Sequence, residues 1–301
     1  MAHTLAVDVV TAEVVGALGR AGVRSVVLKG PTLAGWLYRG EAVRTYGDSD
    51  LLVSAADRGT AEAELARLGF EQEMTEMAAD DVLLAWSGPW RRGRSVVDLH
   101  TSYYGIGADP ARAWEVLARD TEQLTVARAT VEAPALPQRA LLVALHAAHH
   151  GGRAPRAMTD LDRAVRLVPE EVWRDAASVA EEIDAVGALA AGLTMLPPGE
   201  LLALRIGLAG RASPESTLRR TEVAEGFARL SAADGAGARA RLLGRELCPS
   251  PAFLRWSTPL ARRGRRGLAA AYVWRWVWLA RRAPAGYLAF RRMRRNDSAA
   301  S

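Results

Sequence analysis

The chain has 301 residues, half of them apolar and 24% charged, and its mean hydropathy is −0.02. This balance is typical of a globular protein and excludes an intrinsically disordered chain, and the length suffices for one large or two ordinary domains with buried cores. The net charge of +5 is unevenly distributed, because the chain from Arg255 onward holds 12 arginines and one acid, whereas residues 1–254 hold 27 basic and 33 acidic groups.

The cysteine content and the N-terminus bear on the cellular compartment. Cys248 is the only cysteine, so the chain forms no internal disulfide bond, which fits a reducing compartment. The N-terminal residues contain an aspartate and no basic stretch ahead of an apolar core, so they do not resemble a signal peptide. We therefore expect a cytoplasmic protein, and the basic C-terminal end leaves open a peripheral position at a membrane.

The N-terminal third alternates helix and strand patterns. Apolar spacing predicts a helix over residues 5–20, and a β-branched run predicts a short strand over residues 24–28. Pro31 fits the first position of a second helix, which extends to residue 38, because a helix start leaves that N–H group unbonded.

Further elements complete a small mixed α/β unit. A strand is predicted over residues 48–53, and a helix over residues 57–68 ends at Gly69. Three more strand patterns follow, at residues 82–86, at 95–100 and around 122–132. We expect residues 1–135 to form one domain around a small mixed β-sheet.

The chain after residue 135 is predicted to be mainly helical. Alanine, leucine and arginine periodicity over residues 136–247 predicts an all-helical domain, and residues 248–301 form a basic segment rich in tryptophan and arginine. The apolar run over residues 268–282 is too short and too charged to span a bilayer. The predicted fold is thus α+β: a mixed-sheet domain followed by a helical domain, with the active cleft between them.

The strongest chemical pattern lies at the predicted 48–53 strand. Successive strand residues alternate faces, so Asp48 and Asp50 project on the same side with their carboxylates close together. Adjacent anions need a cation between them, and the hard cation that binds carboxylates and phosphates together is Mg²⁺, with Mn²⁺ as the alternative. Gly30 lets the backbone approach a ligand, and the helix that follows directs free N–H groups toward phosphate.

Asp98 provides a third carboxylate, in a strand pattern that predicts burial. An acid at such a position is costly without a cation or several hydrogen bonds. Paired metals held by carboxylates promote in-line transfer at phosphorus, so we interpret Asp98 as the ligand nearest the attacking group and as its general base. His100 faces the same way as Asp98 and is expected to orient it or to touch the substrate.

These motifs together resemble a known family. The segments LKGPTLAGWLY (28–38), RTYGDSDLLV (44–53) and VVDLH (96–100) resemble the nucleotidyltransferase superfamily of the polymerase-β type, and most of all its bacterial branch called the uncharacterised nucleotidyltransferase family. The resemblance implies that Asp48, Asp50 and Asp98 bind the metal and catalyse. It also implies transfer of a nucleoside monophosphate from an NTP to an acceptor, with release of pyrophosphate.

We expect the nucleotide to contact Lys29, Gly30, Thr32 and Arg44. Lys29 is the only lysine among 39 basic residues, which suggests a position that needs a compact point charge; chance retention at the surface is the alternative. Pro31 stands where the superfamily usually has serine, so Lys29 and Arg44 are expected to supply phosphate contacts. The same departure leaves open a catalytically inactive relative that binds a nucleotide or a partner without turnover.

Two features of the helical region leave alternatives. His146, His149 and His150 share one face of a predicted helix, and packing at the domain boundary is the first interpretation. Lining of the active cleft by His146 or His149 is the second. We interpret three further residues, Asp160, Asp162 and Arg163, as a helix-start cap and an ion pair rather than as catalysts.

The basic C-terminal segment has three interpretations. Its tryptophans at positions 274, 276 and 278 could stack on nucleic acid, insert into a membrane interface or cover the helical domain. Packing is the first interpretation for most of these rings, because a spacing of two turns them to different sides of a helix. The candidate partners are therefore an anionic membrane or RNA, besides the NTP and an acceptor that could be a small molecule, a peptide, a protein or an RNA end. A membrane-surface accessory protein is a further alternative function.

Overall fold

The computed structural model describes residues 2–38, 43–72, 87–150, 154–212, 227, 230, 231 and 235–300. The chain divides into two compact units, Met1–Ser213 and Pro214–Ser301. The division at residues 135 and 247 that the sequence favours stays a prediction.

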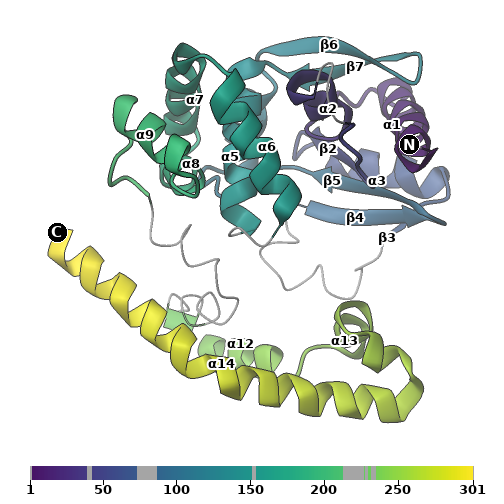
Figure 1. Cartoon of the computed structure of the whole chain (residues 1–301). Coiled ribbons are helices and arrows are strands. Elements are labelled where there is room, and N and C mark those ends of the chain that lie inside the picture. The colour runs from purple at the N-terminus through teal and green to yellow at the C-terminus, as the bar shows by residue number, and fades with distance from the viewer. Residues whose placement is uncertain are drawn as a thin grey trace. The chain divides into compact units, whose positions relative to one another are not determined.

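A mixed β-sheet forms the centre of the first unit (Figure 1). Its seven described strands are β1 (Ser25–Val27), β2 (Ser49–Val53), β3 (Glu71–Gln72), β4 (Ser87–Arg92), β5 (Ser95–His100), β6 (Thr121–Val126) and β7 (Ala129–Pro134). They run in the order β3-β4-β5-β2-β1-β7-β6, with β2 parallel to β5, β1 parallel to β7 and the other neighbours antiparallel. The mixed sheet confirms the predicted α+β class, and the strand predicted at 82–86 lies outside the described residues.

The described helices of the first unit pack against this sheet or against one another. They are α1 (Ala2–Arg20), α2 (Pro31–Leu37), α3 (Arg58–Arg67), α4 (Pro110–Leu117), α5 (Leu136–His150), α6 (Pro155–Leu167), α7 (Glu170–Glu182), α8 (Val186–Leu193) and α9 (Pro197–Arg205). Strand alternation sends Val27 and Leu51 into one core with α1 and α3, and Val26 and Leu52 into another with α5. The sheet and the helices that follow it therefore share a hydrophobic core.

Helix α1 is apolar enough to require an explanation. Among the described helices, it alone has the length and composition to cross a membrane. Its apolar residues Val10, Val14 and Leu18 are buried in the same core as the strand residues Val27 and Leu51. Packing against the sheet accounts for its apolarity.

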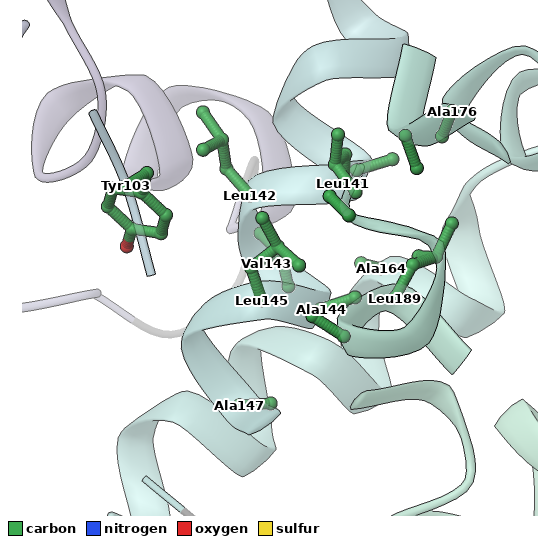
Figure 2. Packing of buried hydrophobic residues seen from close by; sticks show 14 of the residues in the cluster. Tyr103, Leu141, Leu142, Val143, Ala144, Leu145, Ala147, Ala164, Ala176 and Leu189 are labelled. Atoms are coloured by element: carbon green, nitrogen blue, oxygen red, sulfur yellow. The ribbon is translucent and has the colours of Figure 1, made fainter. Parts of the chain in front are cut away.

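Helix α5 is the centre of the other core. Leu141, Leu142, Val143, Ala144 and Leu145 are all buried, as expected of a helix that is apolar on every side. Figure 2 shows these side chains in the cluster that also contains Ala164 of α6, Ala176 of α7 and Leu189 of α8. This packing fixes the end of α5 that carries the histidines.

The second unit consists, where described, of α12 (Gly235–Leu247), α13 (Pro251–Ser257), a 3-10 helix (Pro259–Arg262) and the long helix α14 (Gly264–Ala300). Ser250 caps α13 by accepting a hydrogen bond from the Phe253 N–H. A small core of Leu254, Ala261 and Ala271 joins α13, the 3-10 helix and α14.

Candidate active site

The turn between β1 and α2 begins the site. Gly30 has φ = 67° and ψ = −113°, a conformation that favours glycine, and a Cβ there would lie 3.2 Å from the Tyr46 ring. Pro31 begins α2, as predicted. The Thr32 hydroxyl donates a hydrogen bond to the Val27 carbonyl at 2.9 Å, which ties the first turn of α2 back to β1.

Two acidic residues face each other across neighbouring parallel strands. The register of β2 and β5 pairs Asp50 with Asp98 and Leu52 with His100. Because residues two apart share a face, these side chains lie on the α5 side of the sheet, where Leu52 is buried. Ligand atoms of Asp50, Asp98 and His100 all lie within 4.8 Å of one another.

Lys29 completes this cluster. Its Nζ lies 2.8 Å from Asp50 Oδ1, and His100 Nε2 lies 3.3 Å from the same oxygen. The Lys29 side chain is 13% exposed and that of Asp50 is 3% exposed, so Lys29 is not a surface residue. Burial raises the pKa of Asp50, but the Lys29 ammonium and the His100 hydrogen bond outweigh it and hold the pKa below its ordinary value.

The other two carboxylates have the opposite electrostatic balance. Burial, followed by the charge of Asp50, raises the pKa of Asp48. Burial also raises the pKa of Asp98, where His100 and Lys29 act in the lowering direction and Asp50 in the raising one. Asp48 lies just before β2 and is not part of the group whose ligand atoms lie within 4.8 Å of one another. The third member of that group, beside Asp50 and Asp98, is His100.

A buried ion pair joins the chain ahead of β2 to helix α6. Arg44 donates to both carboxylate oxygens of Asp160, at 3.0 Å from Nε and 2.8 Å from Nη2. Arg44 is 7% exposed and Asp160 is 1% exposed, and the Tyr38 hydroxyl also donates to Asp160, at 2.6 Å. Asp160 lies within α6 rather than at its start, so the predicted cap is wrong, whereas the predicted ion pair is present, with Arg44 as the partner of Asp160.

A signal for this pair exists in the sequence. The buried residues of α6 are Ala157, Asp160, Leu161 and Ala164, whose spacing is that of an apolar helix face. An acid within such a face is costly unless it has a charged partner. The pattern therefore predicts that a positively charged side chain contacts Asp160, although it does not identify that side chain.

The histidines of α5 differ in their surroundings. His146 Nδ1 lies 3.4 Å from the Tyr103 hydroxyl, and His146 borders, together with Lys29 and Asp160, a gap that has no room for a water molecule. Burial and the nearby Lys29 charge lower the pKa of His146 well below its ordinary value. The His149 ring instead stacks on Tyr104, with centroids 3.5 Å apart. The Lys29 ammonium lies over the ring of Tyr103, and no pattern in the sequence predicts that Tyr103 belongs to the site.

Comparisons with known proteins bear on the family of the chain. A family model described as an uncharacterised nucleotidyltransferase matches residues 2–197. No curated protein matches the chain. The solution structure of the antibiotic-resistance factor ANT(2'')-Ia is similar over 58% of this chain and 91% of that one, with 17% sequence identity and a TM-score of 0.42. Because the family model covers more than half of the sequence, the chain belongs to the uncharacterised nucleotidyltransferase family.

Proposed function

We propose that the chain transfers a nucleoside monophosphate from an NTP to an acceptor in a reaction that depends on Mg²⁺ or Mn²⁺. The acceptor nucleophile forms a bond to the α-phosphorus, and the bond to the pyrophosphate leaving group breaks. The observation that carries the proposal is the group formed by Asp50, Asp98 and His100, with ligand atoms within 4.8 Å of one another beside Lys29.

The donor set fits a divalent cation. Carboxylate oxygens are the ligands that Mg²⁺ and Mn²⁺ prefer, and Asp50 and Asp98 supply them from adjacent strands. Asp48 is a further candidate ligand: burial and then the charge of Asp50 raise its pKa, and a cation bound nearby would stabilise its ionised form. A bound ion supplies charge neutralisation on the phosphate oxygens and on the attacking group.

The remaining residues bind and position the substrate. Lys29 and Arg44 provide positive charge for the phosphates, and Gly30 opens the backbone to them. Arg44 Nη1 is buried and has no hydrogen-bond partner among the described residues, which leaves this donor for a phosphate oxygen. Asp98 takes the proton of the attacking group as general base, and its raised pKa suits that task.

The partners and the location complete the proposal. The acceptor is a small molecule, a peptide, a protein or an RNA end. The single, exposed cysteine supports a cytoplasmic location. The excess of arginine in residues 248–301 supports contact with an anionic membrane or RNA.

The test uses α-labelled NTPs with two sources of acceptors, a deproteinised cell extract and the heat-treated protein fraction of the same extract. We expect labelled product and pyrophosphate in the presence of Mg²⁺ and neither with a chelator. Asp98→Asn should lower the rate by about 100-fold or more, the range for loss of a general base. Asp162→Asn, at a half-buried position of α6 where the carboxylate pairs with Arg166, is the matched control and should leave the rate unchanged. Binding of NTP without pyrophosphate release would instead identify a non-catalytic binding protein.

A further inference from the structure

One long face of helix α14 is exposed and largely apolar. The exposed positions that form it recur every three or four residues, which is the spacing of a single helix face. Its large apolar members Val273, Trp274, Val277 and Leu288 are 55%, 56%, 40% and 55% exposed. The α14 stripe is defined here as Arg266, Ala270, Val273, Trp274, Val277, Arg281, Pro284, Leu288 and Arg291.

The opposite face of α14 holds the helix in place. Ala271 is buried against α13 and the 3-10 helix, and Tyr272 donates a hydrogen bond to the Pro249 carbonyl at 2.7 Å. Arg275 donates to the Glu246 carbonyl at 2.8 Å. These contacts fix the rotation of the helix, so that the exposure of the stripe follows from the packing of the second unit.

The charge of the segment indicates the kind of partner. Arginines stand at both ends of the stripe and within it, and the chain from Arg255 onward carries 12 arginines against one acid. A helix that combines an exposed apolar stripe containing tryptophan with many arginines is suited to the interface of an anionic bilayer. The guanidinium groups attract the lipid headgroups, and the indole sits at the boundary between headgroups and acyl chains.

We propose that the α14 stripe binds the surface of an anionic membrane, with the helix lying in the plane of the interface. Val273, Val277 and Leu288 gain free energy by leaving water for the acyl-chain boundary, whereas RNA offers aliphatic side chains no comparable environment. This binding is independent of nucleotidyl transfer, so its test does not depend on the proposed reaction.

The test is sedimentation of the full chain with vesicles of phosphatidylcholine and phosphatidylglycerol at low salt. We expect binding that weakens about tenfold or more with phosphatidylcholine alone, and similarly at 0.5 M salt, because headgroup attraction is screened. Trp274→Ser with Val277→Ser should weaken binding about tenfold, since it removes apolar area while keeping every charge. Leu201→Ser with Leu204→Ser is the matched control: these α9 residues are 57% and 56% exposed, and binding should not change.

Several results would overturn the proposal. The full chain could remain in the supernatant at low salt, or the Trp274→Ser/Val277→Ser variant could bind as tightly as the unchanged chain. Tighter binding to a short RNA than to the vesicles, measured by anisotropy, would assign the arginines to nucleic acid instead. Quenching of the unchanged chain's tryptophan fluorescence by brominated lipid needs no variant, and its absence in the vesicle-bound chain would contradict insertion of Trp274.

Discussion

At the scale of single residues, Asp50 and Asp98 lie opposite each other but differ in what stabilises them. Asp50 has Lys29 at 2.8 Å and His100 at 3.3 Å, and its pKa is lowered. Asp98 is held in the same group by the strand register, and its pKa is raised by burial. The site therefore contains one carboxylate that supports the fold and one whose charge opposes it.

We expect the two corresponding substitutions to change stability in opposite directions in chelator at pH 7. Asp50→Asn should lower the free energy of unfolding by about 3–5 kcal/mol, because it leaves the Lys29 charge buried without its partner. Asp98→Asn should raise it, because it removes a carboxylate that is more stable ionised in the unfolded chain than in the folded one. Urea titration of both variants measures the difference.

The pH dependence of the Asp98→Asn effect follows from the raised pKa. A carboxyl group whose pKa is higher in the folded chain destabilises it progressively as pH rises above the unfolded value of 3.8. The gain in stability should therefore be complete at neutral pH and shrink as pH falls toward 3.8. A loss of stability in Asp98→Asn at pH 7 would contradict this electrostatic interpretation.

Local patterns predicted the part of the site that consecutive residues build. Lys29 and Gly30 lie between β1 and the helix that Pro31 begins, and alternation along β5 puts Asp98 and His100 on one face. The pairing of Arg44 with Asp160 joins residues 116 positions apart, and no local pattern selects one partner among 38 arginines. His100 lies in the group with Asp50 and Asp98 because the register of β2 and β5 brings it close to Asp50. Sequence spacing does not encode the register between distant strands.

At the scale of elements, the structure confirms the helices predicted in the N-terminal third of the chain. The helices predicted over 5–20, 31–38 and 57–68 appear as α1, α2 and α3, and the pattern around 122–132 resolves into the hairpin of β6 and β7. The turn of that hairpin uses positive φ angles at Ala127 and Arg128, residue types that carry no turn signal. The sequence also offers no indication that α5 and α8 cross closely, apart from Gly192.

Gly192 sets the distance between α5 and α8. A Cβ at this position would overlap the backbone carbonyl of Ala144, which cannot move without moving α5. We expect Gly192→Ala to lower the free energy of unfolding by about 1–3 kcal/mol or more through overpacking. Gly19→Ala on α1 is the matched control, because a Cβ there meets nothing within 4 Å and alanine should stabilise the helix by a few tenths to about 1 kcal/mol. Equal effects in the two variants, measured by thermal melting, would rule out the proposed close approach.

At the scale of the whole molecule, composition and contacts divide the chain in a consistent way. Residues 1–254 carry a net charge of −6 and the remainder +11, and the contacts separate Met1–Ser213 from Pro214–Ser301. The family model ends at residue 197, within the first unit. Every residue assigned here to the metal, to the nucleotide or to their support lies in that unit, whereas the α14 stripe lies in the other.

We therefore expect a chain that ends at Ala212 to fold and to retain nucleotidyl transfer while losing vesicle binding. The shared core of the sheet and helices α5 to α9 is complete before that residue, with Leu189, Leu193 and Leu202 among its last large contributors. Circular dichroism, thermal melting and pyrophosphate release compare this fragment with the full chain. A fragment that ends at Ala185 is the control, and it should not fold, because it lacks the buried leucines of α8 and α9. An unfolded or inactive 1–212 fragment beside an active full chain would show that the second unit takes part in the fold or in catalysis.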